Sequence, residues 1–373
     1  MSRRPVVVDL LFFTGLKGGM ESYVREVYGR LDRDDPELEF IGFASSELAA
    51  ARAPWFPGAL VDSGISGEDR IAWARGELFA VDRFARRVGA AVLHCPANFG
   101  PASPHVPVVL TVHDLLAFRY PEYVPGRYAA VIRAMVRRAA RTADRVITVS
   151  DASRGDLHDL LGVASDRVTV VPLAGSDASA TATAEADRRR DDQLLAVGNR
   201  MPHKNFERLL EALAEIPASR RPRLVVTGSH GPDPLAATVA ALGLGEWVAL
   251  RGWLGADELD RLYRESTALV FPTLFEGFGL PTLEAMSRGC PVICSDLPVL
   301  RDVAGPAARY FDPRDPASIA ASIVAVLSDA GLRTRMAAAG SARASEFSWE
   351  RTARETRDVL RSVATPAHRS RGR

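Results

Sequence analysis

Apolar, β-branched runs recur along this chain with helical segments between them, and this rhythm constrains the fold more than any other feature. In the first half the runs cover residues 6–12, 38–44, 90–97, 106–114, 145–150 and 167–173. Runs that are apolar throughout, with no polar alternation, predict strands covered on both faces. Helical segments between such strands indicate a parallel, doubly wound α/β sheet.

The rhythm stops once and then restarts, which indicates two domains. Residues 174–193, "AGSDASATATAEADRRRDDQ", hold no apolar residue larger than alanine and are predicted to form a linker. Further apolar runs then cover residues 194–199, 223–229, 247–254, 268–274, 291–297 and 308–313. We therefore expect two Rossmann-like domains, 1–173 and 194–346, which would face each other across a central cleft.

Charge, cysteine content and hydropathy exclude several classes of protein. The formal net charge of the 373 residues is +1, so no general attraction to nucleic acid is expected. Cys95, Cys290 and Cys294 lack further ligands at metal-binding spacing, which favours a reduced, cytoplasmic chain. The start, "MSRRPVVVDLLFF", is predicted to form a buried first strand, and no apolar run is long enough to cross a bilayer.

Ligands of open parallel sheets bind beyond the carboxyl ends of the strands, so the polar residues there are the candidates. In the first domain Gly18 and Gly19 precede a helix expected to start near Met20, which leaves backbone amides for an anion or a sugar. His94 is expected to be structural. His113 is expected to serve the ligand site, with its ring oriented by the adjoining Asp114.

The second domain opens with "AVGNRMPHKNFERLLEAL", in which a strand, a short loop and a helix follow one another. The loop brings Arg200 and Lys204 to the start of a helix expected near Asn205. A guanidinium, an ammonium and helix amides together suit a diphosphate group, whereas a solvated basic loop is the alternative.

The segment "FPTLFEGFGLPTLEAM", residues 271–286, carries two carboxylates around a turn. Glu276 ends a buried strand, the glycines after it allow a tight turn, and Pro281 suits the first turn of the next helix. Amides at 278–281 would face the ligand. Two acids near a diphosphate would repel it unless each accepts from hydroxyl donors, so Glu276 and Glu284 are interpreted as sugar-hydroxyl acceptors.

These motifs, together with "GLKGGMESYVREV", "VVLTVHDLLAFRYPEY" and "RVITVSDASRGDL", resemble the retaining GT-B glycosyltransferases of glycosyltransferase family four, the glycogen-synthase-like superfamily. The resemblance runs from Gly18 to residue 360. Its most specific part is the Glu-x7-Glu segment from Glu276 to Glu284. It also implies that the C-terminal helix, 347–363, packs back onto the first domain.

The resemblance implies roles for the residues that match. The Gly18-Gly19 pair would approach the donor on its phosphate side, and His113 would lie near the transferred sugar. Arg200 and Lys204 would hold the diphosphate, although Asn199 stands where many members have the phosphate-binding arginine.

In the second carboxylate segment the resemblance places the sugar and the phosphate against Glu276, Gly277 and the amides of Phe278, Gly279 and Leu280. Glu284 would bind the ribose.

The expected activity is therefore transfer of a sugar from a nucleoside diphosphate to an acceptor hydroxyl with retention of configuration. GDP-mannose is favoured over a UDP-sugar as donor. No strand end offers an Asp-x-Asp pair, so no essential metal or other cofactor is expected.

The sequence leaves three alternatives to this activity. The first is a nucleotide-sugar epimerase of the same fold. The second is an NAD-dependent oxidoreductase, which the lack of a Gly-x-Gly-x-x-Gly fingerprint opposes. The third is a non-catalytic sugar-binding protein.

The segment 127–145 is a predicted helix in which Arg133, Arg137, Arg138 and Arg141 alternate with apolar residues. Such a composition can lie on anionic lipid, which would place the protein on the cytoplasmic face of a membrane. The alternative is a solvated helix that packs through its Val, Ile and Met side chains.

Overall fold

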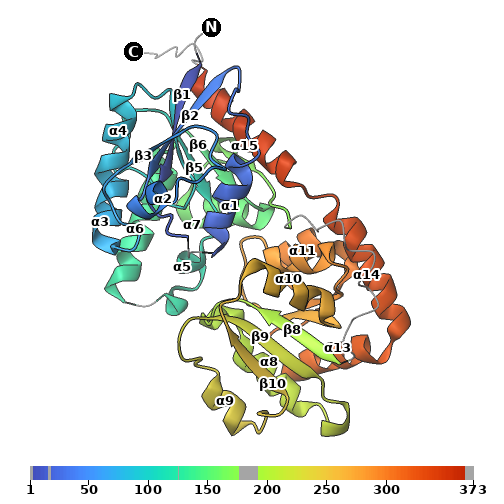
Figure 1. The fold of residues 1–373 in the computed structure, drawn as a ribbon. Coiled ribbons are helices and arrows are strands. Elements are labelled where there is room, and N and C mark those ends of the chain that lie inside the picture. The colour runs from blue at the N-terminus through green and yellow to red at the C-terminus, as the bar shows by residue number, and fades with distance from the viewer. Residues whose placement is uncertain (1–2, 16–17, 125, 176–191, 366–373) are drawn as a thin grey trace. The chain divides into compact units, whose positions relative to one another are not determined.

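The computed structural model describes residues 3–15, 18–124, 126–175 and 192–365, and these form two units, one of residues 1–173 with 349–373 and one of residues 174–348 (Figure 1). The boundary at 173 coincides with the predicted one. Most of the predicted linker lies outside the described residues.

Unit 1 contains a parallel sheet in the order β3-β2-β1-β4-β5-β6-β7. Its strands are β1 (Arg4–Leu10), β2 (Leu38–Ala44), β3 (Ala59–Asp62), β4 (Val92–Cys95), β5 (Val108–Val112), β6 (Arg145–Thr148) and β7 (Val168–Val170). Its helices are α1 (Gly18–Tyr28), α2 (Ser46–Ala50), α3 (Arg70–Arg75), α4 (Val81–Arg87), α5 (Leu116–Arg119), α6 (Arg127–Thr142), α7 (Asp151–Leu161) and α15 (Trp349–Ala364). A π-helical turn, Gly76–Ala80, joins α3 to α4.

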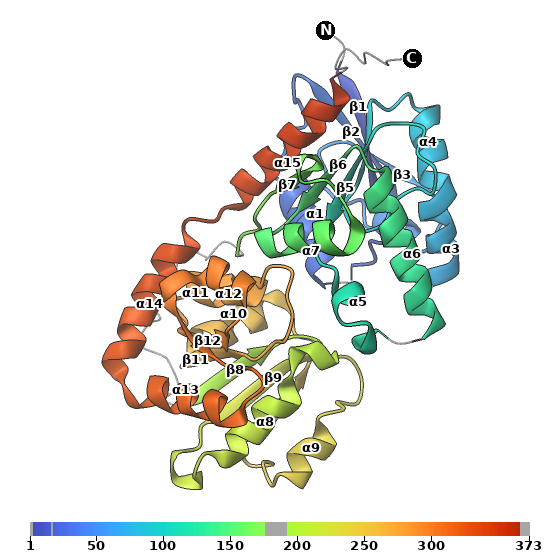
Figure 2. The ribbon, with the colours of Figure 1, turned by 180° about the vertical axis from the view of Figure 1, so that it is seen from behind.

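Helices cover both faces of this sheet, as the continuous apolar runs predicted. On one face, α4, α6 and α7 contribute Val81, Phe84, Val136 and Leu157 to a cluster with strand residues such as Leu93. On the other, α1 packs against α15, which contacts β1, β4, β5 and β6 (Figure 2).

The C-terminal helix α15 is therefore part of unit 1. Its buried positions recur every three or four residues along one side, as expected of an amphipathic helix. Arg357 pairs with Asp35, and Arg361 donates to Glu37 with 3.1 Å between Nη1 and Oε1. Burial would raise the pKa of Asp35, but the hydrogen bonds from Arg357 and from two backbone amides outweigh burial and lower it.

Unit 2 contains a parallel sheet in the order β10-β9-β8-β11-β12-β13. Its strands are β8 (Gln193–Val197), β9 (Arg223–Ser229), β10 (Val248–Gly252), β11 (Ala268–Phe271), β12 (Val292–Ser295) and β13 (Ala308–Phe311). Its helices are α8 (Phe206–Glu215), α9 (Ala236–Ala241), α10 (Ala256–Glu265), α11 (Leu280–Ser287), α12 (Pro298–Ala304), α13 (Pro316–Ser328) and α14 (Ala330–Ala344).

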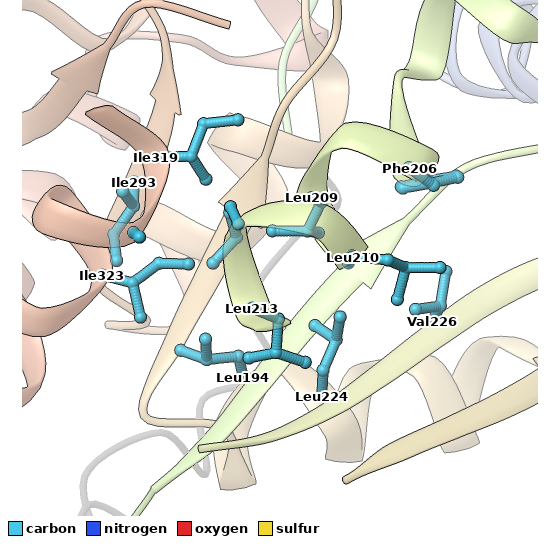
Figure 3. Close-up of a cluster of buried hydrophobic side chains, with 14 of the residues drawn as sticks. Leu194, Phe206, Leu209, Leu210, Leu213, Leu224, Val226, Ile293, Ile319 and Ile323 are labelled. Atoms are coloured by element: carbon cyan, nitrogen blue, oxygen red, sulfur yellow. The ribbon is translucent and has the colours of Figure 1, made fainter. Parts of the chain in front are cut away.

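The core of unit 2 shows why "FERLLEALAE" forms a helix. Phe206, Leu209, Leu210 and Leu213 recur at helical spacing and are all buried. Figure 3 shows them facing strand and helix side chains, including Leu194, Leu224, Val226, Ile319 and Ile323. This packing fixes the loop before α8.

No single helix within the described residues is both long and apolar enough to span a membrane. One bent pair of helices, residues 316–328 with 330–364, meets the length and composition that a membrane span needs, on those two criteria alone.

His94 is structural, as expected. It is fully buried on β4, where Tyr28 bonds its Nδ1 and Thr111 Oγ1 lies 2.9 Å from its Nε2. Burial, together with the electrostatic interaction with the neighbouring His113 ring, lowers the pKa of His94 from 6.5 to about 3. The folded protein therefore holds this ring neutral where the unfolded chain is protonated.

This burial predicts a stability that falls as the pH drops. Between pH 6.5 and about 3 the unfolded chain binds a proton that folded His94 does not, so folding stability is lost on acidification. In the His94→Gln variant, the slope of the free energy of unfolding against pH should be smaller by up to about 1.4 kcal/mol per pH unit. Urea unfolding between about pH 5 and 7 measures it, with the exposed His158→Gln as control. An unchanged slope in His94→Gln would contradict the assignment.

Candidate functional site

The carboxyl ends of β8 and β11 in unit 2 bring Lys204 and Glu276 together. Lys204 Nζ lies 2.6 Å from Glu276 Oε1, and their side chains are 14% and 12% exposed. Gly198 lies beside the Lys204 side chain at φ 150°, a backbone conformation that residues with a Cβ rarely adopt. The two residues predicted to serve phosphate and sugar are thus paired with each other in this structure.

Asn205 fixes the backbone beside Lys204. It adopts a left-handed conformation at φ 59° between the turn Pro202–Lys204 and α8. Its side-chain amide donates to the carbonyls of Pro272 and Pro313, at 3.0 and 2.8 Å. The carbonyl of His203 accepts from the Leu274 amide at 2.7 Å, so the loop is tied to the strand end that carries Glu276.

The turn after Glu276 leads directly into α11. Gly277, Phe278 and Gly279 are buried, and Gly279 has φ 99°, where an added Cβ would lie 2.5 Å from the Leu300 side chain. Helix α11 then begins at Leu280. Phe278 packs edge-on against Phe347, with 6.0 Å between ring centroids, and this contact anchors the turn. The amides of the turn lie at the start of α11.

Glu284 lies on α11 and is held by Tyr263 of α10. The Tyr263 hydroxyl donates to Glu284 Oε2 at 2.8 Å. Burial and the adjacent carboxylate raise the pKa of Tyr263, so the hydroxyl stays a donor. Tyr263 thereby orients the carboxylate predicted to bind ribose, and sequence reasoning missed it because it lies 21 residues away.

Arg200 departs from the sequence expectation. Its guanidinium pairs with Asp233, with 2.7 Å between Nη2 and Oδ2, and its Nη1 donates to the carbonyls of Gly198 and Thr227. The side chain is only 7% exposed. In this structure Asp233, on the loop after β9, draws the guanidinium inward, and a direct diphosphate contact of Arg200 stays a prediction.

In unit 1, His113 follows β5 and its ring is fixed by backbone. Nε2 donates to the carbonyl of Pro96 at 2.8 Å, which leaves Nδ1 without a proton. Burial lowers the pKa of His113, so the ring is neutral. Asp114, which was expected to orient the ring, accepts from the Leu116 amide at 3.0 Å through Oδ1, and its orienting role stays a prediction.

Gly18 and Gly19 open α1, which begins two residues earlier than expected. The buried carboxylate of Glu21 accepts from the Thr14 and Gly15 amides at 2.6 and 3.1 Å. Glu21 therefore ties the end of β1 to the first turn of α1. The sequence analysis did not single out Glu21, although an acid in the first turn after a Gly-Gly pair is a usable signal.

Unit 1 also contains a cavity of about 520 Å³ at the carboxyl edge of its sheet. Its lining is partly aromatic, and Trp73 meets Phe99 edge-on at 5.0 Å between ring centroids. Lining side chains come from the segment after β1, from α3 and from α6, and include Phe12, Thr14, Glu68, Arg70, Trp73, Phe99 and Ile132.

Among the described residues, no group of three or more His, Cys, Asp or Glu side chains is arranged to hold a metal ion. Metal independence stays a prediction.

Both halves of the chain match known families of glycosyltransferases. Residues 17–174 match the model described as Glycosyltransferase Family 4, and residues 182–343 match Glycosyl transferases group 1. O-antigen chain mannosyltransferase B of Escherichia coli is 34% identical over 66% of this chain and 68% of that protein. D-inositol 3-phosphate glycosyltransferase of Frankia alni is 32% identical over 95% of this chain and 97% of that protein.

Solved structures share the fold. Sucrose-phosphate synthase from Thermosynechococcus elongatus has a TM-score of 0.74 at 19% identity, with 97% of this chain and 99% of that chain covered. Anabaena HepE in complex with UDP and glucose has a TM-score of 0.73 at 17% identity, covering 96% and 100%.

Two parallel α/β units with these neighbours define the GT-B class of glycosyltransferases. The chain belongs to glycosyltransferase family 4. The sequence-based recognition of fold and family is confirmed, and nothing in these comparisons supports the epimerase alternative.

The Arg200–Asp233 pair yields a prediction about stability. Removing one partner leaves the other charge buried, so Arg200→Ala and Asp233→Ala should each lower the free energy of unfolding by about 3 kcal/mol. The double variant should lose less than the sum. Thermal and urea unfolding of the set measures the coupling. Additive losses, or a stable Arg200→Ala protein that cannot bind nucleotide, would restore the ligand role of Arg200.

Proposed function

We propose that this protein transfers a sugar from a nucleoside-diphosphate donor to an acceptor hydroxyl and retains the anomeric configuration. The observation that carries the proposal is the Lys204–Glu276 ion pair beside the start of α11. Both charges are largely buried, so neither can lose its partner without a replacement.

A nucleoside-diphosphate sugar provides both replacements. Its phosphates take the place of the carboxylate on Lys204, and a sugar hydroxyl takes the place of the ammonium on Glu276. The amides of Phe278, Gly279 and Leu280 add donors at a helix start, where negative charge is stabilised. Glu284, oriented by Tyr263, is assigned to the ribose.

The same groups support the chemistry. As the bond from the anomeric carbon to the phosphate oxygen breaks, Lys204 and the amides stabilise the charge that develops on the diphosphate. The acceptor oxygen forms its bond to the anomeric carbon on the same face, and its proton passes to the departing diphosphate. In this scheme no side chain acts as a nucleophile.

Unit 1 is proposed to bind the acceptor. Its cavity of about 520 Å³ is large enough for a sugar residue. Trp73 and Phe99 offer apolar ring faces, while Glu68 and Arg70 supply one charge of each sign, a lining that suits a neutral saccharide better than a phosphate. His113, neutral with an unprotonated Nδ1, is assigned to accept from a substrate hydroxyl.

We propose GDP-mannose as the donor and the cytoplasm as the compartment. The Escherichia coli relative is named a mannosyltransferase, which favours GDP-mannose, whereas the HepE complex contains UDP. Cys95 and Cys294 are buried free thiols, which supports a reducing, cytoplasmic compartment.

Nucleotide binding should separate the roles of the charged residues. Lys204→Ala should weaken nucleoside-diphosphate affinity roughly tenfold to a hundredfold, because a charge-assisted contact contributes about 1.5–3 kcal/mol. Glu284→Gln should also weaken it. Glu276→Gln should not weaken it, because Glu276 is assigned to the sugar and loss of its charge frees Lys204 for the diphosphate. Calorimetric titration measures all three.

The exposed Glu207→Gln, on the first turn of α8, is the matched control and should bind as the wild type does. Equal losses of nucleotide affinity in the Glu276 and Glu284 variants would show that their roles are not separable. Full affinity in Lys204→Ala would refute the diphosphate site.

Donor choice, metal use and stereochemistry can be tested in one assay. Hydrolysis and transfer are screened across GDP- and UDP-sugars in excess chelator, and the product anomer is read by proton NMR. We expect turnover with GDP-mannose without metal, and an α-linked product from an α-linked donor. Activity that only magnesium or manganese restores would contradict metal independence. An inverted anomer would contradict retention.

A further inference from the structure

Three large apolar side chains of unit 1 are exposed on its helices. Ile71 on α3, Phe79 on the π-helical turn and Val131 on α6 are 75%, 59% and 53% exposed. Large apolar groups that gather on one surface mark an interaction site more often than scattered ones do.

The helix 70–87, formed by α3, the π-helical turn and α4, alternates these apolar groups with arginines. Ile71, Arg75, Phe79 and Arg83 follow each other at steps of four, which places them along one side. Arg70, Arg86 and Arg87 are exposed as well.

The acids of the same helix are both buried. Glu77 accepts from Trp73 Nε1 at 2.9 Å, and Asp82 accepts from the His105 amide at 2.7 Å. Every exposed charge between residues 70 and 87 therefore belongs to an arginine. Glu68 and Asp69, which are exposed, lie just before α3, and Asp69 caps its first turn.

Helix α6 continues this surface. Its sequence contains no acid, its Met135, Val136, Ala139 and Ala140 are buried, and Val131 is exposed together with three arginines, Arg137, Arg138 and Arg141. The packed side predicted as the alternative for this segment is thus present, and the outer side is basic.

The two helices belong to one surface. Figures 1 and 2 both show α6 beside α3 and α4. Arg138 Nη2 donates to Ser103 Oγ at 3.2 Å, and the neighbouring Ala102 amide donates to the Leu78 carbonyl at 3.1 Å. We call this surface the basic face, defined by Ile71, Arg75, Phe79, Arg83, Arg86, Val131, Arg137, Arg138 and Arg141.

We propose that the basic face docks on an anionic lipid bilayer. Apolar tips flanked by guanidinium groups match the boundary between acyl chains and headgroups, where Ile71, Phe79 and Val131 enter the apolar layer while arginines bind phosphates. The cavity assigned to the acceptor is lined by Trp73 of α3 and Ile132 of α6, so the docked helices also supply its wall.

Vesicle sedimentation of the full chain tests the proposal. Binding to phosphatidylcholine vesicles that contain phosphatidylglycerol should exceed binding to phosphatidylcholine alone at least tenfold and should fall with salt. Arg75→Gln/Arg83→Gln should reduce the partition coefficient about fivefold per arginine. Ile71→Ser/Phe79→Ser should reduce it about tenfold or more.

Matched controls lie on unit 2. Trp253→Ser removes an apolar side chain that is 52% exposed, and Arg220→Gln/Arg314→Gln removes two exposed arginines. Both should bind vesicles as the wild type does, and circular dichroism checks that all variants are folded. Equal binding to neutral vesicles, or loss in the controls as large as in the basic-face variants, would overturn the proposal. Self-association through the face without vesicle binding would overturn it too.

Discussion

A parallel strand covered by helices on both faces can present polar groups to a ligand only at its ends, and this constraint organises both units. The strands of each sheet are apolar and largely buried, while Lys204, Glu276 and His113 all follow carboxyl ends. The loops there are held by backbone carbonyls, as Asn205 and His113 show. The functional side chains are therefore placed by the sheets and not by loops alone.

The Lys204–Glu276 pair explains how such a site can be stable without a ligand and still bind one. Each charge is paired with the other in this structure, which avoids leaving a buried charge unpaired. In the proposed function, a ligand with a diphosphate and sugar hydroxyls would replace this one ion pair with two contacts, one to Lys204 and one to Glu276. A diphosphate alone frees Lys204 but leaves Glu276 near negative charge, so the sugar contributes to recognition beyond its own contacts.

Most of the strands and the candidate site residues that follow them were predictable from the sequence. The strands are continuous apolar runs, and the site motifs come directly after them. Long-range partners were not predictable. Asp233 captures Arg200 from another strand end, and Tyr263 orients Glu284 from another helix, so neither contact appears in local spacing. Strand β3 was missed because "ALVD" follows a Pro-Gly pair and its apolar run is shorter than the runs that were predicted to be strands.

The most direct test of the account is a crystal structure of the protein with a nucleoside-diphosphate sugar. The account predicts the diphosphate on Lys204 and the amides at the start of α11, the ribose on Glu284, and Glu276 turned from Lys204 to a sugar hydroxyl. Arg200 should keep its contact with Asp233. A ligand bound elsewhere, or one bound while the Lys204–Glu276 pair stays intact, would contradict the central claim.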